Sequence, residues 1–334
     1  MAEYRYLHGP VHQFHLTEFS GKYDCAYRCF VAFRDGPLGA VVGAARATKP
    51  TLVMNYDALI AFQIPKMRQR FEPLDAVRYA LSIGLGQDPL DAWQLAFVDD
   101  HKGPRIVPSF CAVLGHPGFW LADPRTTVDA SRVVHAEEGF RLVNPLLTAG
   151  EVTGETRIVD VIDKGRDKGA LVYLEKDLRD AATGTLLATE TRTLMLRGDG
   201  GYGGPSGQSR PTPPAPTGQP DFVAEIPTRP EQALLYRLNG DPNPLHLDPA
   251  VAAKAGYAKP ILHGLCTFGV ACQVLLRTLA ETRPERLKAM SARFTAPVFP
   301  GETIKVETWK DGVFQARVVE RDIVVLSHGR VEIE

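Results

Sequence analysis

The sequence predicts an α+β protein built from two copies of one unit, in which helices come first and an antiparallel sheet follows. Tyr79-Ala80-Leu81-Ser82 matches Tyr236-Arg237-Leu238-Asn239, and segments 140–150 and 294–301 share a Phe, a Pro and a Gly. Both halves then continue into strands of alternating polar and apolar residues, over 155–163, 170–178 and 186–196 and again over 303–309, 313–320 and 323–331. Helices followed by a sheet, repeated once, are typical of a two-unit α+β fold.

A segment rich in Gly, Pro, Ser, Thr and Gln separates the two copies over residues 198–220. It has too little apolar surface to offset its ordering entropy, so we expect a flexible linker between units at 54–197 and 221–334. Residues 1–53 match neither copy and are expected to form an N-terminal extension. A G-x-G-x-x-G pattern begins at Gly198, but a nucleotide site needs a helix directly after it, and prolines follow instead.

The helices of the second unit have readable ends. Thr228 to Glu231 predicts a capping box that starts a helix, and Gly240 predicts a left-handed C-terminal end to the same helix. Asp248-Pro249 predicts the start of a short helix that Gly256 closes. The run from Gly264 to Leu279 is apolar on most faces, which predicts a buried central helix.

The composition is that of an ordinary globular protein. The chain has 334 residues, 44% of them hydrophobic and 23% charged, and a formal net charge of -1, which gives no footprint for nucleic acid or an anionic membrane. Its five scattered cysteines form no C-x-x-C motif, which favours a reducing compartment. There is no apolar run of about 18 residues, no secretory start, and no peroxisomal address at residues 331–334. A cytoplasmic location is therefore expected.

Asp241 and His246 lie in one turn stiffened by two prolines, and His263 and Gly264 open the long apolar run. An imidazole can accept a proton from water at neutral pH, and a carboxylate can position that water or share the proton. The N–H of Gly264, at the start of the predicted helix, can stabilise negative charge on an oxygen. Asn243 can orient the pair or a substrate group. These are the parts needed to add water across an activated double bond.

Structural roles remain open for the same residues. Asp-Pro and Asn-Pro are turn dipeptides, so Asp241 and Asn243 can serve the turn alone. A histidine directly before a buried helix, as His263 is, more often fills a structural role than a binding one. One Asp and one His at this spacing fall short of a ligand set, so no metal is expected. The lack of a G-x-S-x-G motif argues against a serine hydrolase.

The segment Gly240 to His246 resembles the G-D-x-N-P-L-H signature of hydratase 2, the (R)-specific enoyl-CoA hydratases of the MaoC-like family. The similarity continues through 259–269 and 292–302 and covers roughly residues 54–334, most strongly in the second half. It is greatest to the two-repeat, eukaryotic-type form found as a domain of peroxisomal multifunctional enzymes. The resemblance implies a double hot-dog fold, in which each antiparallel sheet wraps a long central helix.

For function, the resemblance implies reversible syn hydration of (2E)-enoyl-CoA to (3R)-3-hydroxyacyl-CoA by a hydro-lyase. No cofactor is expected, because CoA is part of the substrate. By this resemblance Asp241 and His246 would be the catalytic pair, with Asn243 beside them, and Gly264 would be the oxyanion donor. The candidate substrate-binding residues are Asn243, His263 and Arg293. The candidate partners for the CoA phosphates are Arg293, Lys305 and Lys259.

The first copy lacks the pair, because Gly84 falls opposite Asp241 and no histidine lies between Gln69 and Asp100. By the same resemblance, this repeat is expected to be non-catalytic and to give room to the acyl tail, and a homodimer is the family default. The alternatives are a dehydratase of acyl-carrier-protein or steroid-type thioesters, a hot-dog thioesterase, and a non-catalytic acyl-CoA binding module. The complete set of Asp241, His246 and Gly264 argues against the binding module, which needs no base.

Overall fold

The computed structural model describes residues 54–334, so the extension expected over residues 1–53 lies outside the described residues. α-Helices (α) and short 3-10 helices (η) precede and connect the strands. They are α1 (Tyr56–Ile60), α2 (Pro73–Ser82), α3 (Ala92–Leu95), η1 (Pro108–Ala112), η2 (Trp120–Ala122), η3 (Pro124–Thr126), η4 (Ala130–Arg132), α4 (Gln232–Tyr236), η5 (Arg237–Asn239), η6 (Pro244–His246), α5 (Pro249–Lys254), α6 (Gly264–Thr278) and η7 (Pro284–Arg286). Among these residues, no helix is both long and apolar enough to cross a membrane.

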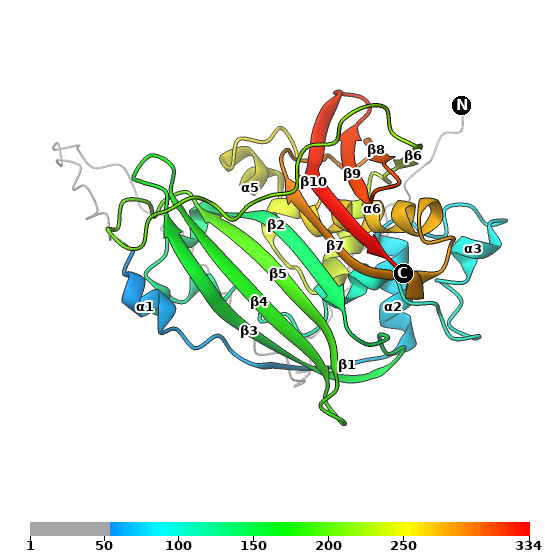
Figure 1. Cartoon of the computed structure of the whole chain (residues 1–334), viewed down its shortest axis with the longest axis horizontal. Helices are drawn as coiled ribbons and strands as arrows, with labels where there is room; N and C mark the ends of the chain where they lie inside the picture. Colours follow the sequence, from blue (N-terminus) through cyan, green and yellow to red (C-terminus); the bar gives the residue numbers. More distant parts are fainter. Residues whose placement is uncertain (1–53) are drawn as a thin grey trace, which may run out of the picture. The chain divides into compact units, whose positions relative to one another are not determined.

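One ten-stranded antiparallel sheet runs through both repeats in the order β1-β3-β4-β5-β2-β7-β10-β9-β8-β6 (Figure 1). The first repeat supplies β1 (Met67–Phe71), β2 (Val133–Leu142), β3 (Gly150–Asp163), β4 (Ala170–Asp180) and β5 (Leu186–Leu196). The second supplies β6 (Phe222–Pro227), β7 (Leu287–Phe294), β8 (Thr303–Thr308), β9 (Val313–Val318) and β10 (Ile323–Ile333). Corresponding strands hold mirrored places in this order, and β2 pairs with β7, with Gly139 opposite Ser291. The predicted two-repeat α+β architecture is confirmed.

The long helix α6 is the centre of the second repeat. Every residue from Cys266 to Leu276 is buried, and the helix packs against β6, β7, β8 and β10. In the first repeat the short 3-10 helix η1 contacts α6, β2 and β5 instead. The two repeats therefore share their sheet but differ in what fills the concave side.

Three of the predicted helix ends are confirmed. Gly240 follows η5 with a φ of 104°, in the left-handed region that favours glycine. Asp248 caps α5 by accepting a hydrogen bond from the N–H of Ala250 at 2.8 Å. Gly256, just after α5, also has a positive φ of 88°.

The capping box predicted at Thr228 is wrong. Helix α4 starts later, at Gln232, and its N-cap Glu231 makes no side-chain cap. The Thr228 hydroxyl instead donates to the carbonyl oxygen of Glu302 at 2.7 Å and accepts from the N–H of Gly301 at 2.9 Å. The Thr228 hydroxyl therefore forms a tertiary contact with the turn before β8 and does not cap the helix.

Gly201 and Gly203 of the G-x-G-x-x-G segment, together with Gly165 of the β3–β4 turn, surround a carboxylate of the protein itself. Asp163, the last residue of β3, accepts hydrogen bonds from the N–H groups of Gly165 at 2.8 Å, Gly201 at 2.7 Å and Gly203 at 3.1 Å. A Cβ on Gly200 would collide with the carbonyl oxygen of Gly165. These glycines therefore bind the end of β3, where the linker leaves the first repeat.

Candidate active site

The turn between η5 and η6 carries Asp241 and Asn243. Asp241 Oδ1 accepts a hydrogen bond from the N–H of Asn243 at 3.1 Å, and Asn243 Oδ1 accepts one from the N–H of Leu245 at 3.0 Å. Two successive side-chain bonds of this kind hold the turn rigid. The side-chain oxygen of Asn243 thus bonds to its own turn, while the second carboxylate oxygen of Asp241 points toward the histidines.

His246 is 8% exposed, and its Nδ1 lies 2.9 Å from the carbonyl oxygen of Ile261. A carbonyl oxygen only accepts, so the proton of the neutral ring is on Nδ1 and the lone pair is on Nε2. Burial lowers the pKa of His246, although the bond to Ile261 and the charge of Asp241 oppose that change. The ring is thereby held neutral, with a free proton acceptor.

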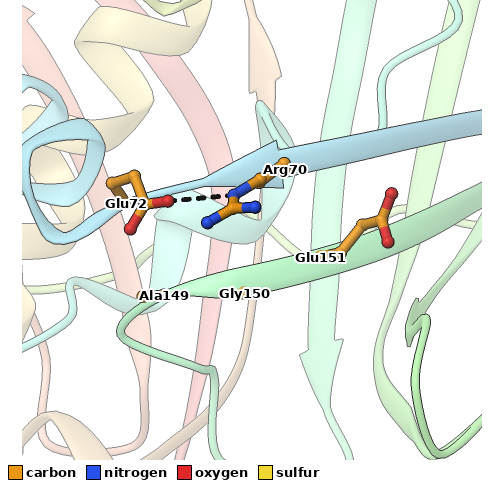
Figure 2. Close-up of a pocket in the computed structure, with 5 residues that line it drawn as sticks. All are labelled: Arg70, Glu72, Ala149, Gly150 and Glu151. Atoms are coloured by element: carbon orange, nitrogen blue, oxygen red, sulfur yellow. Dashed lines mark hydrogen bonds and ion pairs between the residues drawn. The ribbon is translucent and has the colours of Figure 1, made fainter.

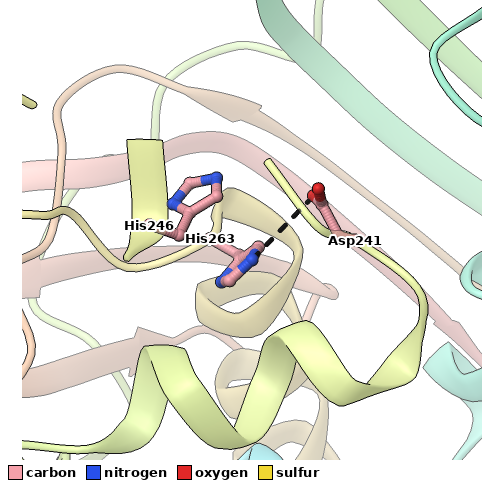
Figure 3. Close-up of side chains that lie close together, drawn as sticks. All are labelled: Asp241, His246 and His263. Carbon is pink, nitrogen blue, oxygen red and sulfur yellow. Dashed lines mark ion pairs between the residues drawn. The ribbon is translucent and has the colours of Figure 1, made fainter. Parts of the chain in front are cut away.

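His263, the N-cap residue of α6, joins this pair (Figure 3). Its ring stacks on that of His246 with centroids 3.6 Å apart, and the tilted ring of Tyr236 lies 4.9 Å from it between centroids. Its Nε2 lies 4.0 Å from Asp241 Oδ2, which is too long for a hydrogen bond. Burial, followed by the charge of His246, lowers the pKa of His263 to about 2, so the ring stays neutral.

The sequence predicted two clustered side chains, and the structure brings three together. One ligand-type atom from each of Asp241, His246 and His263 lies within 4.8 Å of the others. Spacing along the sequence indicated Asp241 and His246. From the residues themselves, the signal for His263 was its place immediately before the central helix. The expectation that no metal binds remains a prediction.

Gly264 is the first residue of α6, and its N–H has no acceptor among residues 54–334. An N–H at this position has no partner inside its own helix and carries the positive end of the helix dipole. A Cβ at Gly264 would lie 3.1 Å from the ring of Phe294, tighter than an ordinary contact. Glycine therefore avoids this tight contact, and its N–H is left without a partner among residues 54–334.

The structure does not bring Arg293 to the cluster. Its guanidinium, on β7, is held by Glu137 of β2 through bonds of 2.6 and 2.9 Å, where the two repeats join. Lys259 is exposed, with its Nζ 3.4 Å from the carbonyl oxygen of Pro300. A CoA phosphate would have to compete with the Glu137 carboxylate for the guanidinium of Arg293.

A continuous two-repeat antiparallel sheet around one buried helix, with a carboxylate and imidazoles at the N-terminus of that helix, defines the double hot-dog class. Two family models match this chain: the MaoC like domain over residues 211–328 and the MFE-2 hydratase 2 N-terminal domain over residues 70–198. The chain belongs to the MaoC-like, hydratase 2 family.

Relatives and solved structures agree with this assignment. The chain is 39% identical to 3-hydroxyacyl-thioester dehydratase Y of Mycobacterium tuberculosis (77% of this chain, 91% of that one) and 36% identical to peroxisomal enoyl-CoA hydratase 2 of Arabidopsis thaliana (84% and 95%). The crystal structure of a MaoC-like dehydratase from Phytophthora capsici matches with a TM-score of 0.72 at 30% identity (84% and 99%). Hydratases and dehydratases of this kind are hydro-lyases, so the predicted enzyme class and fold are confirmed.

The expected cytoplasmic location is wrong. Relatives from Arabidopsis thaliana, Drosophila melanogaster and Mus musculus are all named as peroxisomal. The expectation depended on the lack of readable targeting motifs, and the lack of a short motif says little about where a protein resides. The predicted homodimer remains untested.

Proposed function

We propose that the protein reversibly hydrates 2-enoyl-CoA thioesters to 3-hydroxyacyl-CoA. One observation carries the proposal: the bond from His246 to Ile261 fixes a free Nε2 lone pair beside Asp241, close to the N-terminus of the helix that begins at Gly264. The enoyl-CoA hydratases among the relatives support the substrate class.

In this mechanism the double bond is polarised by the thioester carbonyl. Water, hydrogen-bonded to Asp241, gives a proton to His246 Nε2 as its oxygen bonds to the β-carbon. The π electrons move toward the thioester oxygen, and the N–H of Gly264 stabilises the charge that develops there. The α-carbon then takes a proton from the Asp241/His246 pair, which completes the addition of one water and returns the pair to its starting state. A general acid–base group typically contributes about 10²–10⁴-fold to such a step, and one oxyanion donor about 2.7–4 kcal/mol.

Three further residues support this chemistry. His263 is neutral, and its ring contacts those of both His246 and Tyr236, so it holds the base in place. Asn243 keeps the turn of Asp241 rigid. The water oxygen and the α-proton both arrive on the face of the substrate that meets the pair, which favours syn addition. The (3R) configuration of the product is proposed from the similarity to hydratase 2.

The test uses purified protein and crotonyl-CoA. We expect the absorbance of the conjugated enoyl group to fall, chiral chromatography to show (3R)-3-hydroxybutyryl-CoA, and chelation by EDTA to leave the rate unchanged. A thiol reagent run in parallel should detect no free CoA. An (S) product would refute the stereochemistry, and release of CoA would instead indicate a thioesterase.

A peroxisomal location is the second part of the proposal, supported by the names of the plant, fly and mouse relatives. Expression of the full chain with an N-terminal fluorescent tag should give co-localisation with a peroxisomal marker. Diffuse fluorescence that excludes the marker would refute it.

A further inference from the structure

The three side chains of the candidate active site also make up the donor set of a metal site. Among residues 54–334, Asp241, His246 and His263 are the one group of three or more His, Cys, Asp or Glu side chains whose ligand-type atoms lie within 4.8 Å of one another. Two imidazole nitrogens and one carboxylate oxygen are a set that binds zinc in proteins and leaves a fourth position open. Figure 3 shows the two rings and the carboxylate close together.

His246 and Asp241 are already held in the way that metal ligands are held. The Nδ1 of His246 lies 2.9 Å from the carbonyl oxygen of Ile261, which leaves the lone pair of Nε2 free. Asp241 Oδ1 accepts from the N–H of Asn243 at 3.1 Å, while Oδ2 faces the histidines. A metal-binding histidine usually donates its other ring N–H to a carbonyl or carboxylate, and a ligating carboxylate is itself hydrogen-bonded.

His263 is the residue whose surroundings lack a partner. It is 2% exposed, yet neither of its ring nitrogens has a hydrogen-bond partner among residues 54–334. A buried polar atom without a partner is unfavourable, and a bound ion would satisfy one of these nitrogens.

The spacing of the ligand atoms is close to that of a zinc site. His263 Nε2 lies 4.0 Å from Asp241 Oδ2. Atoms that ligate one tetrahedral zinc ion at about 2.0–2.2 Å lie about 3.3–3.6 Å from one another. The Asp241 side chain is 47% exposed, so it has room for the movement of less than about 1 Å that closes this gap.

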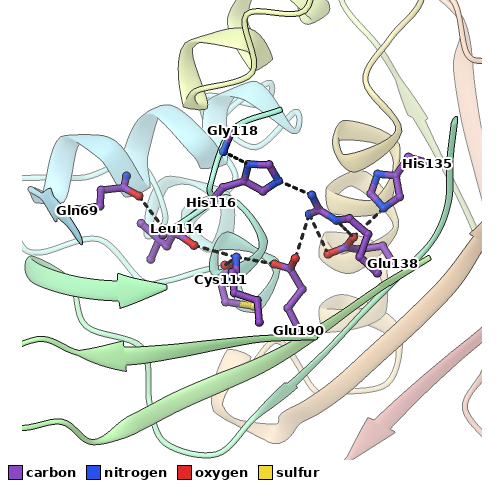
Figure 4. A network of polar contacts seen from close by, with 11 residues as sticks. Gln69, Cys111, Leu114, His116, Gly118, His135, Glu138 and Glu190 are labelled. Carbon is purple, nitrogen blue, oxygen red and sulfur yellow. Dashed lines mark hydrogen bonds and ion pairs between the residues drawn. The ribbon is translucent and has the colours of Figure 1, made fainter. Parts of the chain in front are cut away.

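The buried charges of the first repeat, in contrast, are already paired with one another (Figure 4). Lys176 Nζ lies 2.7 Å from Glu190 Oε2, and Arg192 Nε lies 2.9 Å from Glu138 Oε2. His135 Nε2 lies 2.8 Å from the same Glu138 oxygen. A metal ion at these carboxylates would have to displace a lysine or an arginine, so this cluster is a poor metal site.

The hollow at the β1–β3 edge is also unsuited to a metal ion (Figure 2). Its two carboxylates, Glu72 and Glu151, are bound by Arg70 at 3.0 Å and by Arg68 at 2.6 Å. No histidine or cysteine lines it. Free ligand atoms therefore come together at Asp241, His246 and His263.

We propose that Asp241, His246 and His263 bind one Zn²⁺ ion reversibly, and that the bound ion inhibits the enzyme. The ion takes the lone pair of His246 Nε2, which otherwise accepts the proton of water, and the oxygen of Asp241 that positions this water. The inhibition rests on the proposed hydration, whereas the binding of zinc does not. The inference differs from the expectation that no metal binds.

The first experiment measures hydration of crotonyl-CoA by the full chain, freed of metal with EDTA and then dialysed, at rising concentrations of Zn²⁺. We expect the rate to fall by at least about 10²-fold at saturating zinc, because the general base is lost. Excess EDTA should restore it. Mg²⁺ should have no effect, because it prefers oxygen ligands.

A variant of one ligand locates the site. In His263→Gln the zinc concentration that halves the remaining rate should rise at least about tenfold. The matched control, His8→Gln/His12→Gln/His15→Gln, removes three histidines of the first 53 residues and should keep the wild-type value. An equal value in wild type and folded His263→Gln would overturn the inference, as would a rate that zinc leaves unchanged or raises.

Calorimetric titration of Zn²⁺ measures binding without turnover, in the background of the control variant. We expect one ion per chain, with an affinity that falls at least about tenfold when His246→Ala or His263→Gln is added. Thermal melts confirm that these variants are folded, and an unchanged affinity in both would overturn the site. If zinc binds as expected but the wild type hydrates no enoyl-CoA, the proposed function fails and the metal site stands.

Discussion

His246 Nδ1 lies 2.9 Å from the carbonyl oxygen of Ile261, two residues before His263 and three before the start of α6. The same short segment thus sets the tautomer of the base and supplies the ring that stacks on it. The proposed base and oxyanion donor are consequently placed by one stretch of backbone, and the turn with Asp241 closes over them.

The first prediction concerns the pH dependence of activity. Burial lowers the pKa of His246 below its usual value of about 6.5, so the neutral, proton-accepting form persists below that pH. We expect the acid limb of kcat/KM for crotonyl-CoA to be centred below pH 6.5. An acid limb centred above pH 6.5 would contradict a buried histidine base.

The second prediction concerns stability. The pKa of His263 is about 2 in the folded protein and about 6.5 unfolded. Between these values the unfolded chain binds one more proton, so stability rises with pH, and it is lost as pH falls below about 6.5 by up to about 1.4 kcal/mol per unit. Urea unfolding at pH 7.5 and 5.5 should show this loss in the wild type and a smaller loss in His263→Gln. His101→Gln, at an exposed position, serves as the control and should behave as the wild type.

The third prediction concerns Gly264. In Gly264→Ala the new methyl group would lie 3.1 Å from the Phe294 ring, and overpacking of this kind destabilises by about 1–3 kcal/mol. Turnover should also fall, because a methyl group beside the N–H hinders the close approach of the thioester oxygen. The double variant Gly264→Ala/Phe294→Leu should recover stability without recovering turnover. Recovery of both would mean that Gly264 serves packing alone.

The fourth prediction compares the repeated tyrosines. Tyr79 Oη bonds to Ser109 Oγ at 2.8 Å, whereas the hydroxyl of Tyr236 has no partner among residues 54–334. Tyr79→Phe removes a made bond and should destabilise by about 1–3 kcal/mol, while Tyr236→Phe should leave stability unchanged or slightly higher. Thermal melts of the two variants test this, and equal destabilisation would show that the Tyr236 hydroxyl is also satisfied in the folded protein.

The features that were predicted correctly depend on residues close together in the sequence. Asp248-Pro249, Gly240 and the apolar run after Gly264 act within a few residues, and the structure has the corresponding cap, left-handed turn and helix. The capping role predicted for Thr228 was wrong because its hydrogen-bond partner, Glu302, lies 74 residues away in the sequence. Stacking of His263 on His246 is likewise a tertiary contact that spacing does not encode.

Buried ion pairs of the first repeat, which join Glu138 to Arg192 and Glu190 to both Arg192 and Lys176, show a different limit. In an alternating strand, polar residues are expected to face solvent, yet Glu138, Lys176 and Glu190 are buried. Each charge is tolerated only because its partner stands on a neighbouring strand or in the next position along the same face. Strand register, which the sequence leaves open, is what brings these partners together.

The most direct test of the central claim is the turnover of Asp241→Asn on crotonyl-CoA. This change keeps the size of the side chain and an oxygen that can accept the bond from Asn243, so the fold and melting temperature should be retained. We predict a fall in kcat of about 10²–10⁴-fold, and His246→Ala should give a comparable loss. Turnover near that of the wild type in a folded Asp241→Asn enzyme would contradict the proposed catalytic pair.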